Sequence, residues 1–424
     1  MASKFVLKLL RSGLAKSFLP SLDEFDVIGE PVFTRPSFLN TINELKISYS
    51  KREEGSVVLP LITYIGCDDI GYTVLLSDGT IWSAGIDSGG FFLQGVVVGG
   101  TSSDLIPAVT DKLFTKIFRH WEVCGGLDAG GQAWFWGDQY GQWGCGPIDP
   151  LTCPNTSPIA ILGGGGYSFS DFSVSYPSSA GVTTGGKIYG QGQTWPGMSP
   201  MGIGDLPYAT IRVPTQEVLG KTDWVSVFCG WMKTMAIDSS GRLWGTGINT
   251  DGQLGLGDIN ERTQFTQEVL GKTDWTSVDI GEWHTIALDA SGRVWVTGYN
   301  GDGALGDGIG DISTFTQVDP SKYGNKSVVA VCADAYTSFI LCGDGTLYST
   351  GSNWEGQCGL GHFDDPVLDW TVVLGDSYTM IGASNDTVMG VKSDNTIWYW
   401  GYVPIDYTET ATPIQFNWPD SPVT

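Results

Sequence analysis

Ten consecutive residues of this sequence occur twice, and the second copy begins 51 residues after the first. Thr215–Trp224 and Thr266–Trp275 are identical. A fixed period of about fifty residues is typical of repeat architectures, in which each repeat is one supersecondary unit. A second mark gives the number of repeats, because an aromatic residue, two further residues and a glycine recur along the chain. The occurrences are Trp82/Gly85, Trp134/Gly137, Tyr189/Gly192, Trp244/Gly247, Trp295/Gly298, Tyr348/Gly351 and Trp398/Gly401. The sequence therefore predicts seven consecutive units.

Each unit is predicted to contain four short β-strands. In the unit that holds the second copy, strand-like apolar patterns occupy residues 278–280, 285–288, 293–296 and 315–318. A tight-turn signal such as Asp344-Gly345 precedes most of the recurring aromatic residues. Four strands per unit, repeated around a ring, describe a β-propeller blade. The 60 glycines and the lack of a 3.6-residue apolar period exclude a helical solenoid. We therefore predict an all-β fold, a seven-bladed β-propeller over residues 61–424.

The first 60 residues are predicted to form a short helical and extended anchor. Residues 1–22 contain four basic residues and no acidic one, with apolar residues on one arc of a helical wheel. A signal peptide fits poorly because Lys8 and Arg11 interrupt the apolar stretch. A transit peptide fits the composition better, and a third possibility is an anchor that docks on a partner protein or a membrane surface. An anchor docked on a protein is the preferred interpretation. Residues 23–60 are interpreted as an extended arm. The proposed anchor residues are Lys4, Leu7, Lys8, Leu10, Arg11, Leu14 and Phe18.

The C-terminal segment is expected to close the ring. Residues 412–416 resemble segments that lie between earlier units, such as Val213-Pro214-Thr215-Gln216. We expect this strand to complete the sheet of the first blade, which would remove an exposed sheet edge.

The net charge of −24 argues against a nucleic-acid partner, because phosphate binding requires clusters of lysine and arginine. It is compatible with cationic partners, and equally with a solvated acidic surface. No apolar stretch is long enough to span a membrane. Cys67, Cys229 and Cys332 fall at or beside one first-strand position of their units, where buried thiols are expected.

The repeats resemble those of the regulator of chromosome condensation family. The resemblance rests on Gly281–Leu288, Ser291–Trp295 and Gly303–Gly306, and on matching residues in the units around Trp244 and Tyr348. It covers about residues 61–424 and implies a seven-bladed propeller. The family includes exchange factors for small GTPases, β-lactamase inhibitor proteins and bacterial and phage proteins, so the resemblance does not fix a function. His284 matches the family's structural histidine.

The sequence contains no motif for catalysis. His120, His284 and His362 lie in different units, and neither a nucleophile elbow nor a zinc-protease motif occurs. The segment from Asn300 to Asp311 faintly resembles a calcium loop but lacks the oxygen ligand at Ala304 and the final glutamate. We therefore expect no enzyme activity, no cofactor and no metal.

The candidate binding site is a mouth formed by the loops between the first and second strands of the units. These loops are rich in aromatic and acidic residues, which are frequent in protein interfaces and sugar sites. Packing between neighbouring blades is an equally good explanation of the same residues. The proposed mouth residues are Asp69, Trp121, Glu122, Tyr176, Trp231, Met232, Glu282, Trp283, Asp334, Tyr336, Asn385 and Asp386.

Two functions follow as hypotheses. In the first, the chain is a bacteriophage virion protein of the tail, a fibre or the capsid. Its N-terminus anchors it in a protein assembly, with multiple copies as an open question, and the propeller binds a protein or glycan receptor. In the second, it is a cytoplasmic regulator such as a guanine-nucleotide exchange factor for a small GTPase. Neither hypothesis includes a membrane span.

Overall fold

The chain divides into two compact units, residues 1–59 and 60–424. The computed structural model describes residues of the second unit: 61–68, 71–86, 101–107, 112–120, 123–138, 154–160, 166–175, 177–306, 308 and 310–416. The predicted anchor and arm lie outside the described residues. No helix among the described residues has the length and apolarity to cross a membrane.

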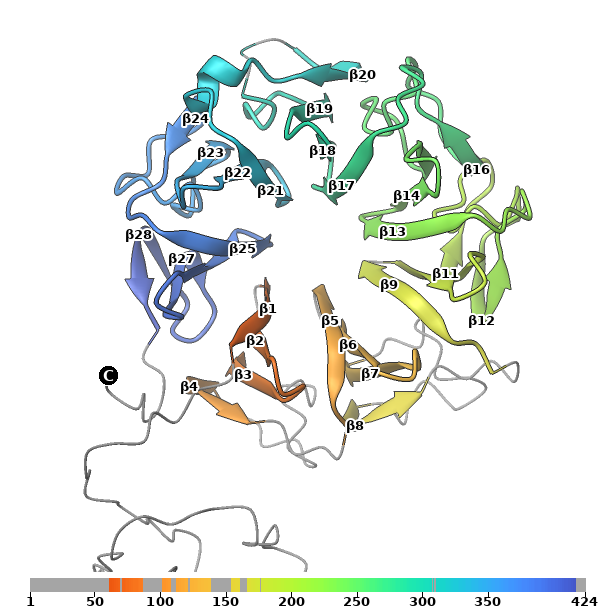
Figure 1. The fold of residues 1–424 in the computed structure, drawn as a ribbon, viewed down its shortest axis with the longest axis horizontal. Coiled ribbons are helices and arrows are strands. Elements are labelled where there is room, and N and C mark those ends of the chain that lie inside the picture. The colour runs from red at the N-terminus through yellow and green to blue at the C-terminus, as the bar shows by residue number, and fades with distance from the viewer. Residues whose placement is uncertain are drawn as a thin grey trace, which may run out of the picture. The chain divides into compact units, whose positions relative to one another are not determined.

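The described residues form seven sheets, each of four antiparallel strands in chain order (Figure 1). The first three sheets contain β1 (Ile62–Asp68), β2 (Gly71–Leu76), β3 (Ile81–Ile86), β4 (Thr101–Pro107), β5 (Phe114–His120), β6 (Val123–Asp128), β7 (Ala133–Asp138), β8 (Pro154–Ala160), β9 (Phe169–Ser175), β10 (Ser178–Thr183), β11 (Ile188–Thr194) and β12 (Ala209–Gln216). The other four contain β13 (Trp224–Gly230), β14 (Lys233–Asp238), β15 (Leu243–Gly247), β16 (Arg262–Gln267), β17 (Trp275–Ile280), β18 (His284–Asp289), β19 (Val294–Gly298), β20 (Ile312–Gln317), β21 (Val328–Ala333), β22 (Thr337–Cys342), β23 (Leu347–Gly351), β24 (Val367–Val372), β25 (Tyr378–Ser384), β26 (Thr387–Lys392), β27 (Ile397–Val403) and β28 (Thr408–Gln415). A short 3-10 helix, η4 (Pro320–Tyr323), precedes β21.

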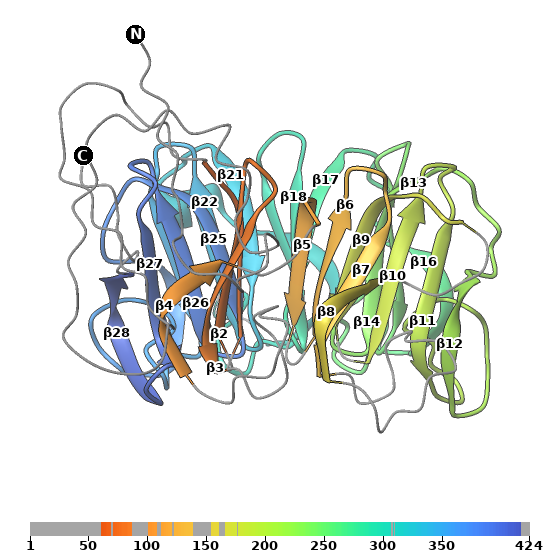
Figure 2. The same ribbon diagram turned by 90° about the horizontal axis from the view of Figure 1, so that it is seen from below.

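This arrangement confirms the predicted seven-bladed propeller. The four strands predicted in the fifth unit correspond to β17, β18, β19 and β20, with ends that differ by a few residues. The first strand of each blade is innermost, as the ring in Figure 1 shows. Figure 2 shows the strands running between two opposite faces of the ring. We call the face with the connections between first and second and between third and fourth strands the loop face. We call the face with the connections between second and third strands and between blades the turn face.

Steric constraints explain why glycine recurs at this position of the repeat. In blade five, Gly298 has a φ of 108°, a conformation that favours glycine. A Cβ placed on it would lie 2.5 Å from the Trp283 carbonyl oxygen. The pairing of β19 with β20 also shifts register between Val296 and Gly298. The same shift occurs at the recurring glycine of the other blades, so this residue marks a bulge in the third strand of each blade.

The recurring aromatic residue stabilises the turn before it. The indole of Trp244 donates to Asp238 Oδ2 at 3.0 Å, and the indole of Trp295 donates to Asp289 Oδ2 at 3.0 Å. Each aspartate also accepts backbone amides of the tight turn, as when Asp289 Oδ1 accepts from the Arg293 N–H at 3.0 Å. The aspartate, the turn and the aromatic ring therefore act as one unit.

Seven buried apolar clusters hold the blades together, one at each junction of neighbouring blades. The cluster between blades one and seven contains Ile65 and Tyr72 from the first blade and Met389 and Ile397 from the last. Burial of this kind of surface is the main driving force of folding. The ring is therefore closed by side-chain packing.

The expectation that the C-terminal strand completes the first blade is wrong. β28 pairs with β27 inside blade seven, and blade one is built from β1, β2, β3 and β4. The apolar residue that follows β28, Phe416, packs against Tyr72 of blade one with ring centroids 5.5 Å apart. The C-terminal segment thus contributes to closure by packing and does not share a strand between blades.

Candidate functional site

The loop face contains all the predicted mouth residues that the structure describes. Asp69, Trp121, Glu122 and Tyr176 lie outside the described residues. The other eight belong to the four short connections that precede β14, β18, β22 and β26. These connections are Trp231-Met232, Gly281-Glu282-Trp283, Asp334-Ala335-Tyr336 and Asn385-Asp386.

Three of these residues form a continuous aromatic ridge across blades four, five and six. The rings of Trp231 and Trp283 have centroids 4.7 Å apart at 56°. The Trp283 indole N–H donates to the Tyr336 hydroxyl at 2.9 Å. The Tyr336 ring in turn meets Tyr299, with centroids 6.3 Å apart. All four side chains are half-buried, so they pack between blades and also present surface to solvent. We call Trp231, Trp283, Tyr336 and Tyr299 the aromatic ridge.

Two buried polar side chains support the ridge from below. Lys233, which has no exposed surface, donates from Nζ to the carbonyl oxygens of Gly281 at 2.8 Å and Glu282 at 2.6 Å. Burial lowers the pKa of Lys233 to about 7. His284 is hydrogen bonded through Nε2 to Ser338 Oγ at 2.8 Å. Burial, and then the nearby Lys233, lower the pKa of His284 to about 3, so its ring is neutral at physiological pH. The two residues fix the connection that carries Trp283.

Asp334 lies beneath the surface instead of on the rim. Its side chain accepts the backbone N–H of Asp386 at 2.8 Å and that of Ala335 at 2.6 Å. Burial, followed by the charge of Asp386, raises the pKa of Asp334 well above its usual value. Asp386 accepts from Gln357 Nε2 at 2.6 Å. Asp334 and Asp386 therefore link blades six and seven. Asn385, which precedes Asp386, has a positive φ of 49°.

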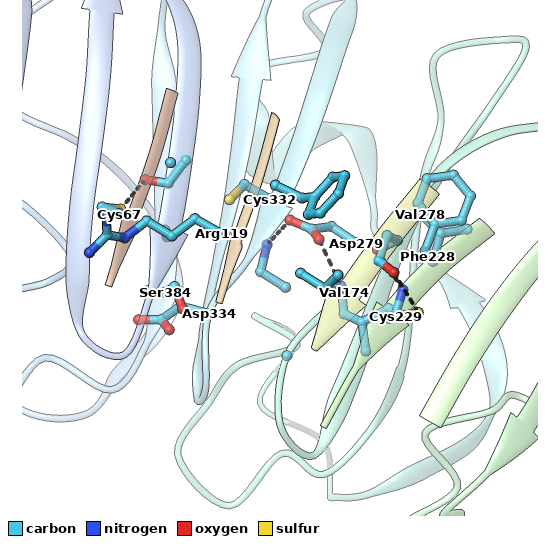
Figure 3. A pocket seen from close by; sticks show the side chains of 18 of the residues that line it. Cys67, Arg119, Val174, Phe228, Cys229, Val278, Asp279, Cys332, Asp334 and Ser384 are labelled. Atoms are coloured by element: carbon cyan, nitrogen blue, oxygen red, sulfur yellow. Dashed lines mark hydrogen bonds between the residues drawn. The ribbon is translucent and has the colours of Figure 1, made fainter. Parts of the chain in front are cut away.

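A cavity of about 340 Å³ lies at the centre of the ring and is lined by the first strands of all seven blades (Figure 3). Arg119 and Asp68 form a buried ion pair there, with Nε to Oδ2 at 2.7 Å. Asp279 accepts the backbone N–H of Ala333 at 2.9 Å, which joins blades five and six. The lining side chains thus connect neighbouring blades, and the cavity is a consequence of the ring.

The cysteines of the cavity are poor nucleophiles. Burial raises the pKa of Cys67 and Cys332 well above the usual value, and that of Cys229 to about 11. The thiolate is the reactive form, so these groups are inert at physiological pH. Cys67 and Cys332 are buried as expected, Cys229 is partly exposed, and all three are free thiols.

The described residues contain no group of three metal-ligating side chains that could hold an ion. In the segment that faintly resembles a calcium loop, Asn300 Oδ1 accepts from the Leu305 N–H and Asp311 Oδ1 accepts from the Asn300 N–H. These oxygens hold the loop in shape.

Sequence reasoning missed the buried charges at the blade junctions. Arg119 and Asp279 sit in first strands among apolar residues, where a charged residue signals a buried partner. Lys233 stands where His284 stands in the next blade, at the start of the second strand. A lysine in place of histidine at the equivalent position of the repeat is the sequence signal from which this buried charge could have been predicted.

Comparisons with known proteins identify the repeats. Two models of the Regulator of chromosome condensation (RCC1) repeat match residues 240–288 and 275–304. The chain is 26% identical over 299 residues to the ultraviolet-B receptor UVR8 of Arabidopsis thaliana, covering 68% of this chain and 66% of that protein. It is 28% identical over 226 residues to the E3 ubiquitin-protein ligase HERC2 of Mus musculus, covering 51% of this chain but 4% of the relative. The matched region thus spans less than two thirds of the length of each of these relatives.

Solved structures agree on the fold. Prp20p from Saccharomyces cerevisiae superposes with a TM-score of 0.69 at 16% identity, covering 82% of this chain and 88% of that one. Human WBSCR16 superposes with a TM-score of 0.65 at 14% identity, covering 76% and 86%. The repeat models and the architecture agree: this chain is a seven-bladed propeller that contains repeats of the regulator of chromosome condensation type.

Proposed function

We propose that the chain is a regulatory module without catalytic activity that binds a protein partner through its loop face. The observation that carries the proposal is the aromatic ridge. Trp231, Trp283 and Tyr336 come from three different blades and form one continuous surface. Tryptophan and tyrosine at the centre of an interface supply a large share of binding energy.

The support beneath the ridge favours a preorganised contact surface. Lys233 and His284 hold the connection of blade five in one position through the bonds described above. A rigid surface loses little conformational entropy when a partner binds. Binding by a fixed surface, with no bond broken, is the function that this geometry supports.

A regulator such as a guanine-nucleotide exchange factor is favoured over a virion component. The curated relatives are eukaryotic proteins whose names describe a receptor and ligases. Neither the ridge nor its support requires attachment to a virion. Docking of the N-terminal residues on an assembly and glycan binding belong to the virion hypothesis.

Site-specific photo-crosslinking tests the proposal. A photoreactive residue replaces Trp354, which is 71% exposed on the loop face. As a control, it replaces Leu270, which is 42% exposed on the turn face. In native cells, position 354 should capture one discrete protein and position 270 should not, and the added changes Trp231→Ala and Trp283→Ala should abolish capture. Capture from position 270 alone, or capture that survives both changes, would contradict the proposal.

An exchange assay with the captured protein tests the more specific form. If the partner binds guanine nucleotide, catalytic amounts of the full chain should accelerate release of fluorescent GDP from it. Binding without acceleration would leave the chain a regulator of another kind.

A second candidate is ultraviolet-B reception, which the name of one relative suggests. The close indole pair of Trp231 and Trp283 favours it, because indoles absorb in this range and the two rings are in contact. Irradiation near the red edge of tryptophan absorption should then change the oligomeric state or partner binding of the wild type and leave the Trp283→Phe variant unchanged. An identical response of both proteins would eliminate this candidate.

A further inference from the structure

The turn face supplies its own cations to its aromatic rings. Lys221 Nζ lies 4.6 Å from the ring centroid of Trp244, and Lys272 Nζ lies 4.5 Å from that of Trp295. Lys392 Nζ lies 3.9 Å from the ring centroid of Trp398. These are favourable cation–π distances. The rings on this face are therefore already matched with cations from within the chain.

The aromatic ridge on the loop face lacks such cations among the described residues. Nine loop-face connections from blade three to blade seven contain no lysine or arginine among their described residues: 195–208, 231–232, 248–261, 281–283, 299–306 with 308 and 310–311, 334–336, 352–366, 385–386 and 404–407. Two basic residues begin strands on this side. Lys233 is buried and bound to backbone carbonyls, and Arg262 is bound to Asp258 at 2.8 Å. The ring faces of the ridge can thus accept a cation from outside the chain.

The same loop-face connections are rich in carboxylates, and Asp302 and Glu282 are near the ridge tyrosines. The acidic residues of these described connections are Asp205, Asp251, Asp258, Glu261, Glu282, Asp302, Asp311, Asp334, Glu355, Asp364, Asp365, Asp386 and Asp406. Burial and neighbouring carboxylates together raise the pKa of two of them. Burial, then Asp365, raise the pKa of Asp302, and burial, then Glu409, raise the pKa of Glu355 to about 7.

Four aspartates of the turn face are paired with lysines instead. Lys221 contacts Asp223 at 3.1 Å and Asp238 at 3.1 Å. Lys272 makes the equivalent contacts with Asp274 at 2.9 Å and Asp289 at 3.1 Å. The two faces therefore differ in charge, and within the described residues the excess negative charge gathers on the loop face.

We propose that the loop face binds a lysine- and arginine-rich segment of a partner protein, whose cationic side chains stack on the aromatic ridge and pair with Glu282 and Asp302. This inference rests on the proposed function and adds the chemistry of the partner. Charge complementarity steers such a segment to the acidic face and away from the turn face. Two loop faces would repel each other, which excludes a second copy of the chain as the occupant.

Peptide binding by the full chain tests the inference. The probe is a short labelled peptide of alternating arginine and serine, measured by fluorescence anisotropy at low and at physiological ionic strength. A peptide of alternating glutamate and serine is the specificity control. The variant E282Q/D302N removes two charges beside the ridge. The variant D223N/D274N makes the same net change on the turn face, at carboxylates of similar exposure to each other, 39% and 40%.

We expect the arginine peptide to bind, the glutamate peptide not to bind, and added salt to weaken binding. E282Q/D302N should weaken binding about fivefold, and D223N/D274N by less than about twofold. No binding, or equal weakening by both variants, would overturn the inference. If the natural partner requires Trp231 and Trp283 but ignores salt and E282Q/D302N, the proposed function stands and this inference fails. If the peptide binds as expected but position 354 captures no protein in cells, the proposed function fails instead.

Discussion

Burial of the Lys233 amino group should make the free energy of unfolding depend on pH. Its pKa falls from an ordinary 10.5 to about 7 in the folded chain because of burial. Between these values the unfolded chain binds a proton that the folded chain does not, so stability rises as pH rises from about 7 to about 10.5. Lys233→Met removes this contribution. The free energy of unfolding from urea titrations should depend less on pH in the variant over this window, by up to ~5 kcal/mol. Parallel pH profiles of variant and wild type would show that Lys233 does not titrate there.

Arg119 and Asp68 should behave as a coupled pair. The pair is bidentate, with a second contact from Nη2 to Oδ1 at 2.8 Å, and Arg119 Nη1 also donates to Thr73 Oγ1 at 2.8 Å. Arg119→Met leaves the Asp68 carboxylate buried without its counter-ion, which costs about 3–5 kcal/mol. Adding Asp68→Asn should recover part of the loss. Chemical denaturation of both single variants and the double variant measures the coupling, and additive losses would refute it.

At this scale the sequence predicted the aromatic loop residues but not their contacts. Trp231, Trp283 and Tyr336 were found from their position before the second strand. That Trp283 donates to Tyr336 of the next blade depends on side-chain orientation, which a repeat pattern does not contain. The burial of Asp334 was missed for the same reason, since Asp386 of the next blade is brought to it by the fold.

At the scale of the structural elements, the bulge in the third strand of each blade can be tested with two glycine substitutions, one inside such a bulge and one outside it. Gly298 has both a positive φ and a carbonyl oxygen 2.5 Å from the position of a Cβ, whereas Gly271 has a φ of 65° and nothing within 4 Å. Gly271→Ala should therefore cost about 1 kcal/mol, from backbone conformation alone. Gly298→Ala should cost more, on the order of 3 kcal/mol, because the clash adds to the strain. Thermal unfolding of both variants compares them, and equal losses would show that the close approach is unimportant.

The duplicated segment shows what a repeat does specify. Glu217 accepts the N–H groups of Leu219 and Lys221, and Glu268 accepts those of Leu270 and Lys272, with matching distances. Identical local sequences give identical local structure. The C-terminal strand was misplaced because its sequence resembles other fourth strands, and such likeness gives strand type but not the blade to which the strand pairs.

For the whole molecule, closure by packing predicts that one ring at the junction of blades one and seven has a global effect. Phe416 is 5% exposed and contacts Tyr72 and Tyr399 with ring centroids 5.5 and 5.6 Å away. Phe416→Ala should destabilise the propeller by about 3–5 kcal/mol. Phe363→Ala, at a ring that is 49% exposed, should change stability by less than about 0.5 kcal/mol. Equal effects in calorimetry would mean that Phe416 does not help to close the ring.

The blade count could be predicted because a copied unit leaves its mark on the sequence seven times. The difference in charge between the two faces could not, because it appears only once each connection is assigned to a face. Lys221 and Lys272 each pair with two carboxylates of the turn face, while the described loop-face connections contain carboxylates and no lysine or arginine. A net charge of −24 alone does not reveal this division.

The claim that the aromatic ridge is the binding surface is tested most directly by the affinity of the purified full chain for its captured partner. Calorimetric titration should show at least about 100-fold weaker binding for Trp231→Ala with Trp283→Ala. The control, Leu219→Ala with Leu270→Ala on the turn face, should bind like the wild type. Unchanged affinity in the double tryptophan variant, with its circular dichroism still that of the folded propeller, would contradict the account.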